Sequence, residues 1–413
     1  MAITVLAGGV GGARFVRGVR EECARRRAGV ADVPAARGTT GAPGTPDAPA
    51  ARGTPDATGT TGATDTPDAT GTTGATDTPD ATGTRNAPNA PNATDATDAT
   101  DATDATDATD ATDISVVVNT GDDLWLAGVR LMPDFDSLLY SLAGVNDTER
   151  GWGRAGETER VAAELREWGV GWPWFTLGDL DLGTHLARTA WLREGATPSE
   201  VAHRLQQRWP LGVRLLPATD TEVDTYVEVA DPDRLDGERE LHFQEWWTRY
   251  RAALPAIAFR QRNIETARPA PGVVEAIVGA DLVLLAPSNP VVSIGTILAV
   301  PGIRRALAET SAPVVGVSPI IGGKVVRGMA DACLPVIGVE TSAEAVGRHY
   351  GARSTGGLLD GWFVDDADAA ALPSLEAIGL TAASVPLWMR DLDTSAALAG
   401  AAIDLGTALR RRG

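Results

Sequence analysis

The sequence predicts a doubly wound, Rossmann-like α/β core that carries a largely helical insertion and a long disordered loop. An apolar run, ITVLA (3–7), meets the glycine-rich GGVGG, and an amphipathic pattern over 13–27 follows it. This order of strand, glycine turn and helix is how such folds begin. The same rhythm of apolar strand, turn and helix returns from about residue 272, so we expect two parts of one core.

The first part of the core is expected in 1–30 and 114–145, with its second strand in ISVVVNT (114–120). Between them, the tract 31–113 is nearly all Ala, Thr, Asp, Gly and Pro, and it has no aromatic residue. Such a tract cannot bury enough apolar surface to offset the entropy lost on ordering. We therefore expect 31–113 to be a disordered, low-complexity insertion.

The stretch 146–254 is expected to be a mainly helical insertion. Three helical patterns lie within it, namely ETERVAAELREWG, GTHLARTAWLREG and TPSEVAHRLQQRW, after a fourth, SLLYSLAG, that begins at residue 137. In TPSE, Thr197 is a helix cap and Glu200 completes a capping box. Two strands, VRLLPAT and TYVEVAD, follow these helices.

The second part of the core is expected in 255–413. It has a strand in DLVLLA (281–286), one helix over 292–307, and a strand with its turn in APVVGVSPIIGG (312–323).

The charge and composition exclude several classes of protein. The 31–113 tract holds 14 Asp and 3 Arg, which is −11 of the formal −19 and leaves −8 for the other 330 residues. A mildly acidic folded part argues against a nucleic-acid partner. The apolar region 281–303 is interrupted by PSNP, so no membrane span is predicted, and the N-terminus lacks the pattern of a signal peptide. Two Cys form no disulfide framework. We expect a cytoplasmic protein without a membrane partner.

The first glycine turn contains Gly8, Gly9, Gly11 and Gly12, and its backbone N–H groups can approach a phosphate closely. It is not a dinucleotide fingerprint, because the last glycine of that motif is replaced by Arg14. The ordinary alternative is a tight turn that binds nothing. Because ligands in open α/β sheets bind at the carboxyl ends of strands, we favour phosphate or nucleotide contact.

Two later turns repeat this theme. Ser288, Asn289 and Ser293 surround the start of the helix after DLVLLA, and Ser318 precedes a Gly-Gly turn in VSPIIGGKVVRG. Ordinary helix capping explains each residue separately. Three such turns in one domain favour a site for a nucleotide diphosphate.

The stretch VNTGDDLWLAGVRLMPDFD (118–136) contains Asp122, Asp123, Asp134 and Asp136, with Arg130 as its one cationic residue. These carboxylates repel one another unless a cation lies between them. Mg²⁺ with oxygen ligands is the natural solution, since it binds one or two carboxylates together with substrate phosphates. A solvated acidic loop is the alternative, as is a ribose-binding role for Asp122 in a dehydrogenase.

Two further residues stand out without a decided role. Trp125 follows the Asp pair and has a flat ring on which another ring can stack. His185, in LGDLDLGTH, is a candidate donor near phosphates, although a structural histidine is an equal alternative.

Several of these motifs together resemble one known family. They are TVLAGGVGGARF, VVVNTGDDLWLAGVRLMPDFDSLLYSLAG, RGWG, LGDLDLGTH, LHFQEWW, LLAPSNPVVSIGTILAVPGIR and VVGVSPIIGGKVVRGMAD, in this order along the chain. The chain is similar to the 2-phospho-L-lactate transferase family of coenzyme F-420 biosynthesis, and within it to the actinobacterial phosphoenolpyruvate transferase type.

The resemblance implies a reaction. A guanosine-diphospho-linked three-carbon acid, lactyl or enolpyruvyl, donates its phospho-acid group to the ribityl hydroxyl of 7,8-didemethyl-8-hydroxy-5-deazariboflavin, and GMP leaves. It also implies a Mg²⁺ requirement, a homodimer, and an acceptor site within 146–254.

The family's site residues carry over onto matching positions of this chain. Asp122 and Asp134 are implied to hold the metal. From the chemistry of phosphoryl transfer we count Asp122, Asp123 and Asp134 as catalytic and expect Asp123 or Asp136 to accept the proton of the attacking hydroxyl. The implied deazaflavin-binding residues are Asn119, Trp125, Asp136 and His185. The implied nucleotide-binding and phosphate-binding residues are Gly8, Gly9, Gly11, Gly12, Ser288, Asn289, Ser293 and Ser318.

One position departs from the family pattern. Relatives often have Arg where this chain has Leu180, and Arg154 and Arg188 are candidate replacements for the missing cation. The alternative function is that of a nucleotide-sugar-binding regulatory protein, like the gluconeogenesis-factor-like family, which shares the glycine turn and the Asp pair.

Overall fold

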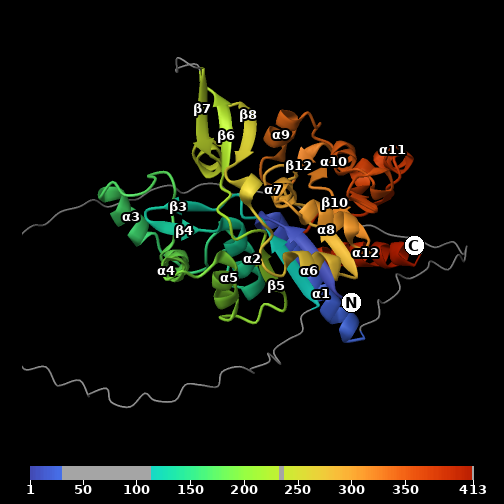
Figure 1. Ribbon diagram of the computed structural model, residues 1–413, viewed down its shortest axis with the longest axis horizontal. Coiled ribbons are helices and arrows are strands. Elements are labelled where there is room, and N and C mark those ends of the chain that lie inside the picture. The colour runs from blue at the N-terminus through green and yellow to red at the C-terminus, as the bar shows by residue number, and fades with distance from the viewer. Residues whose placement is uncertain (30–112, 232–236, 412–413) are drawn as a thin grey trace, which may run out of the picture. The chain divides into compact units, whose positions relative to one another are not determined.

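The computed structural model describes residues 1–29, 113–231 and 237–411 (Figure 1). The tract 31–113, which we predict to be a disordered insertion, lies outside the described residues except for Asp113. Within the described part, no helix has both the length and the apolar character needed to cross a membrane.

A seven-stranded sheet with exclusively parallel pairing forms the centre of the fold and confirms the predicted α/β class. In spatial order its strands are β14 (Thr381–Ser384), β13 (Gly361–Val364), β10 (Val314–Val317), β9 (Leu282–Leu285), β1 (Ile3–Ala7), β2 (Ile114–Val118) and β5 (Arg214–Pro217).

The chain reverses its direction of travel across the sheet between β1 and β9. From β1 it adds β2 and then β5 on one side, and it returns to the other side of β1 to add β9, β10, β13 and β14. The helices that follow β1 and β9 therefore pack on opposite faces of the sheet. The switch point between these two strands, which we call the crevice, is where open α/β sheets bind ligands.

Helices cover both faces of this sheet, and the alternation of side chains along each strand supplies two separate cores. In β1, Ile3 and Val5 belong to a core that contains residues of α1 (Gly9–Arg27), α2 (Pro133–Ala143) and α12 (Leu392–Arg410). Leu6 belongs to the opposite core, with residues of α6 (Val273–Val278), α7 (Ile294–Ala299) and α8 (Ile303–Glu309). Because both faces are buried, the sequence shows continuous apolar runs instead of alternation.

Two helices differ from their predicted limits for clear physical reasons. The helix α1 begins at Gly9, so the glycine-rich segment is the first turn of the helix and not a loop before it. The single helix predicted over 292–307 is wrong, because the chain forms α7 and α8 with a break at Pro301. Proline has no N–H to donate and its ring clashes with the preceding helical turn. Gly302, with φ of 108°, then redirects the chain.

The stretch 146–254 contains three helices and also contributes to two sheets. The helices are α3 (Arg160–Glu167), α4 (Asp179–Arg193) and α5 (Pro198–Gln206), the last with the predicted capping box at Thr197. The two strands that follow do not pair with each other, because β5 joins the main sheet beside β2. The second strand, β6 (Thr225–Ala230), is the centre of an antiparallel sheet with β7 (Glu238–His242) and β8 (Ala256–Gln261), at the top of Figure 1.

The remaining elements are short. They are the hairpins β3 (Leu124–Leu126) with β4 (Val129–Leu131) and β11 (Ile320–Ile321) with β12 (Lys324–Val325), the helices α9 (Ala330–Cys333), α10 (Ala343–Tyr350) and α11 (Leu372–Ala377), and single turns at Glu245–Arg249, Ile264–Thr266, Leu334–Ile337, Arg353–Thr355 and Asp366–Ala371.

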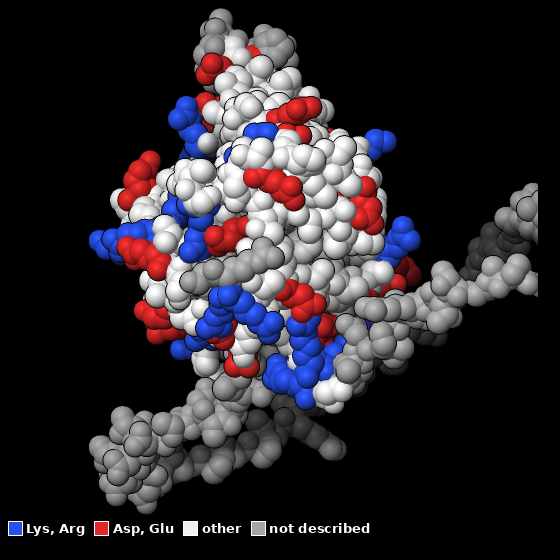
Figure 2. All heavy atoms as spheres, turned by 90° about the vertical axis from the view of Figure 1, so that its right-hand side faces the viewer, with Lys and Arg blue, Asp and Glu red and all other residues white. Residues whose placement is uncertain are grey.

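Charged side chains of both signs are interspersed over the face shown in Figure 2. Ion pairs also link the first and last helices, which pack against each other. Arg25 of α1 reaches Asp393 at 2.5 Å, and Arg26 reaches Asp404 of α12 at 2.8 Å.

The packing of α1 on α12 predicts opposite outcomes for two glycine-to-alanine substitutions. A Cβ at Gly18 would overlap the backbone carbonyl of Ser395, so Gly18→Ala forces the helices apart. We expect the free energy of unfolding to fall by about 1–3 kcal/mol. Gly183 lies in α4 with open space around its Cα, so Gly183→Ala should be neutral or stabilise by up to about 1 kcal/mol. Urea unfolding of both variants measures the difference, and equal effects would contradict this account of the packing.

Candidate active site

The turns after β1 and β9 meet at the crevice, where glycine permits a close approach. The Ser288 hydroxyl accepts a hydrogen bond from the Gly8 N–H at 3.0 Å and donates one to the Gly8 carbonyl at 2.7 Å. A Cβ at Gly11 would lie 2.9 Å from the Pro287 carbonyl oxygen, and one at Gly12 would lie 2.9 Å from the Ser288 hydroxyl. The glycines therefore hold the first turn of α1 against the β9 turn.

The first turn of α1 presents backbone N–H groups at this crevice. Gly8 is the N-cap and supplies no side chain, so the donors of the first turn are not satisfied by a capping residue. Asp134, at the start of α2, accepts a hydrogen bond from one of them, the Gly9 N–H. A helix N-terminus of this kind favours anions.

Asp122 and Asp134 form a buried carboxylate pair beside this turn. The Asn119 amide Nδ2 donates to Asp134 at 2.8 Å and lies 3.2 Å from Asp122. Burial raises the pKa of Asp122 well above its ordinary value, and repulsion from Asp134 adds to the effect. Burial raises the pKa of Asp134 to about 6, although the hydrogen bonds from Asn119 and Gly9 oppose it. Two buried carboxylates thus share one amide group.

A second group of potential metal ligands lies near the first. Among the described residues, Asp136, Asp181 and His185 bring their ligand atoms within 4.8 Å of one another. Their charge is already compensated, because Arg188 forms an ion pair with Asp136 and the Tyr140 hydroxyl donates to Asp181 at 2.7 Å. This group therefore has less need of a metal ion than the Asp122–Asp134 pair.

The Asp122–Asp134 pair fits a hard divalent cation. Within the described ranges, no Lys or Arg side chain forms an ion pair with either carboxylate. Oxygen ligands of this type suit Mg²⁺, whose charge would offset the burial that raises both pKa values and the repulsion that adds to the rise at Asp122. A Cβ at Gly8 would overlap a carboxylate oxygen of Asp134, so the glycine keeps the backbone close to this pair.

An aromatic cavity of about 310 Å³ opens beside α2. Its walls combine flat apolar rings with a few polar groups. They comprise Leu131, Pro133, Asp136, Ser137, Tyr140, Trp152, Gly153, Trp174, Phe175, Thr176, Leu177, Asp181, His185, Gln244, Trp247 and Thr248. Asp136 Oδ2 is buried there without a hydrogen-bond partner, and His185 Nε2 lies 3.4 Å from Asp181 Oδ2. This composition is typical of a site for a flat organic ligand.

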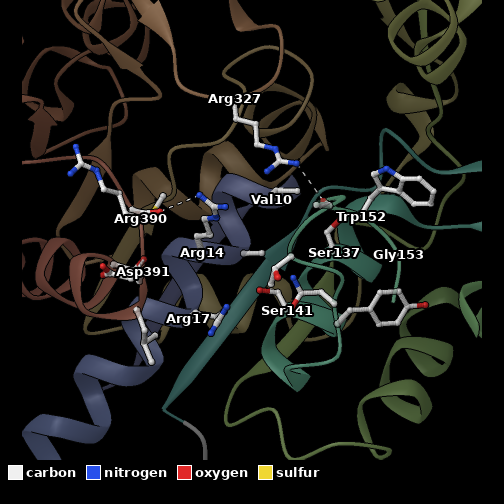
Figure 3. A pocket seen from close by; sticks show the side chains of 18 residues that line it. Val10, Arg14, Arg17, Ser137, Ser141, Trp152, Gly153, Arg327, Arg390 and Asp391 are labelled. Atoms are coloured by element: carbon white, nitrogen blue, oxygen red, sulfur yellow. Dashed lines mark hydrogen bonds between the residues drawn. The ribbon is translucent and has the colours of Figure 1, made fainter. Parts of the chain in front are cut away.

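An arginine cavity of about 350 Å³ adjoins the aromatic cavity (Figure 3). Four residues, Ser137, Tyr140, Trp152 and Gly153, line both cavities. The other lining residues are Val10, Ala13, Arg14, Arg17, Ser141, Asn146, Thr148, Gly151, Arg327, Met389, Arg390, Asp391, Leu392 and Ser395. The predicted phosphate-binding end of α1 and the aromatic cavity are therefore connected by a positively charged space.

Other residues of the acidic stretch point elsewhere. Asp123 is buried beside Arg130, at 3.8 Å, and lines neither cavity. Trp125 lies on the β3–β4 hairpin with 41% of its surface exposed, and its indole N–H donates to Glu222 at 3.0 Å. Neither residue reaches the aromatic cavity, so their predicted catalytic and ring-binding roles remain predictions.

The predicted residues of the later turns divide into two groups. Ser293 packs beside Gly8, so it belongs to the crevice. The Asn289 side chain accepts from the Val291 N–H at 2.9 Å and thus shapes its own turn. The Ser318 hydroxyl is likewise engaged locally, since it donates to the Ile320 carbonyl at 2.9 Å.

The two arginines proposed to replace the missing cation at Leu180 line neither cavity. Arg188 is fully buried and bound to Asp136. Arg154 donates to the Leu180 carbonyl at 3.4 Å and stacks on Tyr140 at 5.8 Å. The cations that do face the cavities, Arg14, Arg17, Arg327 and Arg390, come from other segments.

Most of the residues that form the walls of the two cavities were not predicted as site residues from the sequence. The aromatic residues at 172–175 and 246–247 are visible as clusters in the sequence, but nothing there distinguishes a cavity wall from a core. The sequence gives a clearer signal for the cavity arginines of α1. Val10, Arg14 and Arg17 follow the spacing that places side chains on one face of a helix.

Comparison with known proteins identifies the class. Residues 100–378 match the family model described as 2-phospho-L-lactate transferase CofD. The chain is 54% identical over 292 residues to the phosphoenolpyruvate transferase of Nocardia farcinica, which covers 71% of this chain and 86% of the relative. It is 53% identical over 299 residues to that of Thermobifida fusca, with coverage of 72% and 89%. A crystal structure of a UPF0052 family member from Bacillus halodurans aligns with a TM-score of 0.44 at 16% identity, covering 70% of this chain and 91% of that one.

The parallel sheet and the similarity to these relatives together show that the protein is an α/β transferase. The chain belongs to the 2-phospho-L-lactate transferase CofD family. The family predicted from the motifs is thereby confirmed, and the match favours the enzyme over the regulatory nucleotide-sugar-binding alternative.

The buried Arg188–Asp136 pair predicts a large and pH-dependent effect of Arg188→Met. Burial already raises the pKa of Asp136, and the Arg188 charge opposes that rise. Without the arginine, an ionised Asp136 stays buried and unpaired, which typically costs about 3–5 kcal/mol. We expect unfolding in urea to show a loss of this size at pH 8 and a smaller loss at pH 5, because protonation removes the unpaired charge.

The matched control for this prediction is Arg193→Met on the same helix. Arg193 lies at the end of α4, where it donates to the exposed Gly128 carbonyl. The Arg193→Met substitution should change the free energy of unfolding little at either pH. A loss in the Arg188 variant that grows toward low pH would contradict the assignment.

Proposed function

We propose that the protein transfers a phospho-three-carbon-acid group, phosphoenolpyruvyl or 2-phospho-L-lactyl, from a guanosine diphospho donor to the ribityl hydroxyl of 7,8-didemethyl-8-hydroxy-5-deazariboflavin. GMP is released, and the reaction depends on Mg²⁺. The observation that carries the proposal is the buried Asp122–Asp134 pair at the N-terminus of α1, close in sequence to residues of an aromatic cavity. The names of the actinobacterial relatives favour phosphoenolpyruvyl as the transferred group.

The crevice supports the assignment of the donor. A diphosphate is polyanionic, and the first turn of α1 directs N–H groups toward its position. When bound between Asp122 and Asp134, Mg²⁺ would neutralise diphosphate charge and stabilise the departing phosphate. Ser288 and Ser293 keep the β9 turn against Gly8 and so maintain the shape of this site.

The aromatic cavity supports the assignment of the acceptor. Trp174, Phe175 and Trp247 provide flat apolar surface for a tricyclic ring. Asp136 brings an unpartnered carboxylate oxygen to the same cavity, where a ring N–H or a ribityl hydroxyl can donate a hydrogen bond to it, and the His185 ring lines the wall beside it.

The chemistry requires positioning and one proton acceptor. The ribityl oxygen forms a bond to the phosphorus that carries the acid, and the bond from that phosphorus to the oxygen of GMP breaks. Of the two carboxylates expected to accept the hydroxyl proton, Asp136 lines the acceptor cavity and Asp123 does not. We therefore assign this role to Asp136, whose carboxylate is held in position by Arg188 through Oδ1.

A direct transfer assay tests the proposal. The protein is mixed with the deazaflavin and each guanosine-linked acid, with Mg²⁺ or with EDTA, and the product is weighed by mass spectrometry. We expect an enolpyruvyl phosphodiester to form only with Mg²⁺. Asp122→Asn and Asp134→Asn should each lower turnover about 100-fold or more, because each removes a ligand of the ion.

The control is Asp404→Asn, which alters an exposed carboxylate on α12. It should retain normal turnover. The two crevice variants should unfold at the same or a higher temperature than the parent, since Asn removes a buried like charge. Activity near normal in both, or activity that persists in EDTA, would refute the metal assignment.

The acceptor assignment predicts a selective effect of Trp174→Ala. Trp174 lines the aromatic cavity and stacks on Trp172 at 4.6 Å, so its loss removes flat surface from the wall. We expect the Kd for the deazaflavin, measured by its fluorescence, to rise about tenfold, or about 1.4 kcal/mol. Trp168→Ala is the control, because Trp168 is 78% exposed and lines neither cavity. Equal affinities in the two variants would place the ring elsewhere.

A further inference from the structure

The arginine cavity has no role in the site described so far, and one face of α1 contributes two of its four arginines. Val10, Ala13, Arg14 and Arg17 follow the spacing of three and four residues that aligns side chains on one side of a helix. Figure 3 shows Arg14 and Arg17 on this helix with Arg327 above them, whereas the side chain of Arg390 extends away from Arg14. Three guanidinium groups thus border one space.

These arginines lack the carboxylate partners that other arginines of the same helix have. Arg25 and Arg26, near the end of α1, pair with Glu21 and Glu22 at 2.9 and 2.7 Å. At the cavity, by contrast, Arg14 donates to the Met389 carbonyl at 3.1 Å.

The other cationic groups of the cavity are equally uncompensated. Arg327 lies 3.5 Å from the Gly151 carbonyl oxygen, and Arg17 Nε is buried without a hydrogen-bond partner. Among the described residues, none of the four cavity arginines is ion-paired to a carboxylate.

One carboxylate, Asp391, lines the cavity but is committed to another task. It caps α12 and accepts hydrogen bonds from the Thr394 N–H and hydroxyl, both at 2.8 Å. These bonds lower the pKa of Asp391 and keep it ionised. With four arginines and one aspartate on its walls, the cavity carries a formal excess of positive charge.

Both burial and a neighbouring like charge act on Arg327. Burial lowers the pKa of Arg327, and the charge of Arg14 lowers it further. Uncompensated guanidinium groups that converge in this way are stabilised by an anion, and their planar donors match carboxylate and phosphate oxygens. The cavity is therefore suited to a small molecule with more than one negative charge.

The position of the cavity indicates which anion it serves. It shares Ser137, Tyr140, Trp152 and Gly153 with the aromatic cavity, so a ligand whose ring occupies one can extend its tail into the other. The unmodified deazaflavin has no phosphate or carboxylate. The transferred group brings both, so the anionic tail appears only when the group is present.

We propose that Arg14, Arg17 and Arg327 form a binding site for the carboxylate and phosphate of the transferred three-carbon acid. The site orients the acid toward the acceptor and retains it on the product. This inference rests on the proposed function for the identity of the ligand. The positive cavity itself stands on the charges and contacts of the described residues.

A binding measurement without turnover tests the site directly. Phosphoenolpyruvate, which carries a phosphate and a carboxylate, is titrated into the protein by calorimetry in EDTA, so that the metal site does not contribute. We expect the parent to bind it, and Arg14→Gln, Arg17→Gln and Arg327→Gln each to raise its Kd about tenfold. The matched control is Arg304→Gln, an exposed arginine of α8 that lines neither cavity. No binding to the parent, or equal binding to all variants, overturns the proposal.

Steady-state kinetics separate this inference from the proposed function. In the transfer assay the three cavity variants should raise the KM for the guanosine-linked acid about tenfold and leave the KM for the deazaflavin unchanged. Normal transfer by the parent with unaltered KM values in the variants refutes the arginine site alone. A parent that binds phosphoenolpyruvate but transfers nothing refutes the proposed function and leaves the anion site in place. Melting temperatures near the parent value show that the variants fold.

Discussion

The site depends on two buried carboxylates that share one amide group. Asp122 and Asp134 are brought together by Asn119 at the point where the chain reverses across the sheet, and their burial makes the negative charge costly. The surrounding structure supports this arrangement. Gly8 gives Asp134 space beside the backbone, and Ser288 ties the turn after β9 to the turn after β1. A strained electrostatic arrangement is thus maintained by close backbone packing, which is the usual relation between a rigid α/β scaffold and a charged site.

Compensation of charge distinguishes the neighbouring parts of the site. The Asp136 carboxylate is held by Arg188 through Oδ1, whereas its Oδ2 has no hydrogen-bond partner, so the group is fixed in position before any ligand arrives. The Asp122–Asp134 pair carries excess negative charge, whereas the arginine cavity carries excess positive charge. The aromatic cavity borders the second of these and has mainly apolar walls. This separation suits the proposed reaction of a flat neutral acceptor with a polyanionic donor, because each partner is then attracted to a different region.

Local pattern predicted the fold better than it predicted the site. The parallel α/β core follows from continuous apolar runs and glycine turns, and the capping box at Thr197 follows from four adjacent residues. The single helix over 292–307 was wrong because a proline outweighed the helical periodicity on either side of it. The strands β5 and β6 were recognised, but their separation into two sheets depends on long-range partners that local sequence does not reveal.

Within the site, the residues recognisable in advance were those adjacent in sequence, such as the acidic stretch and the glycine turn. Both segments directly follow predicted strands. Because the carboxyl ends of parallel strands lie at one edge of a sheet, the two segments were expected to lie at the same edge. The walls of the two cavities come from segments as distant as Arg14, Arg327 and Arg390, and their meeting was decided by tertiary packing alone. The same holds for Trp125, which neighbours the Asp pair in sequence yet is the exposed residue of an otherwise buried strand. The local sequence pattern determines where each helix or strand forms. It does not determine which elements pack against one another, because the burial of whole surfaces selects those neighbours.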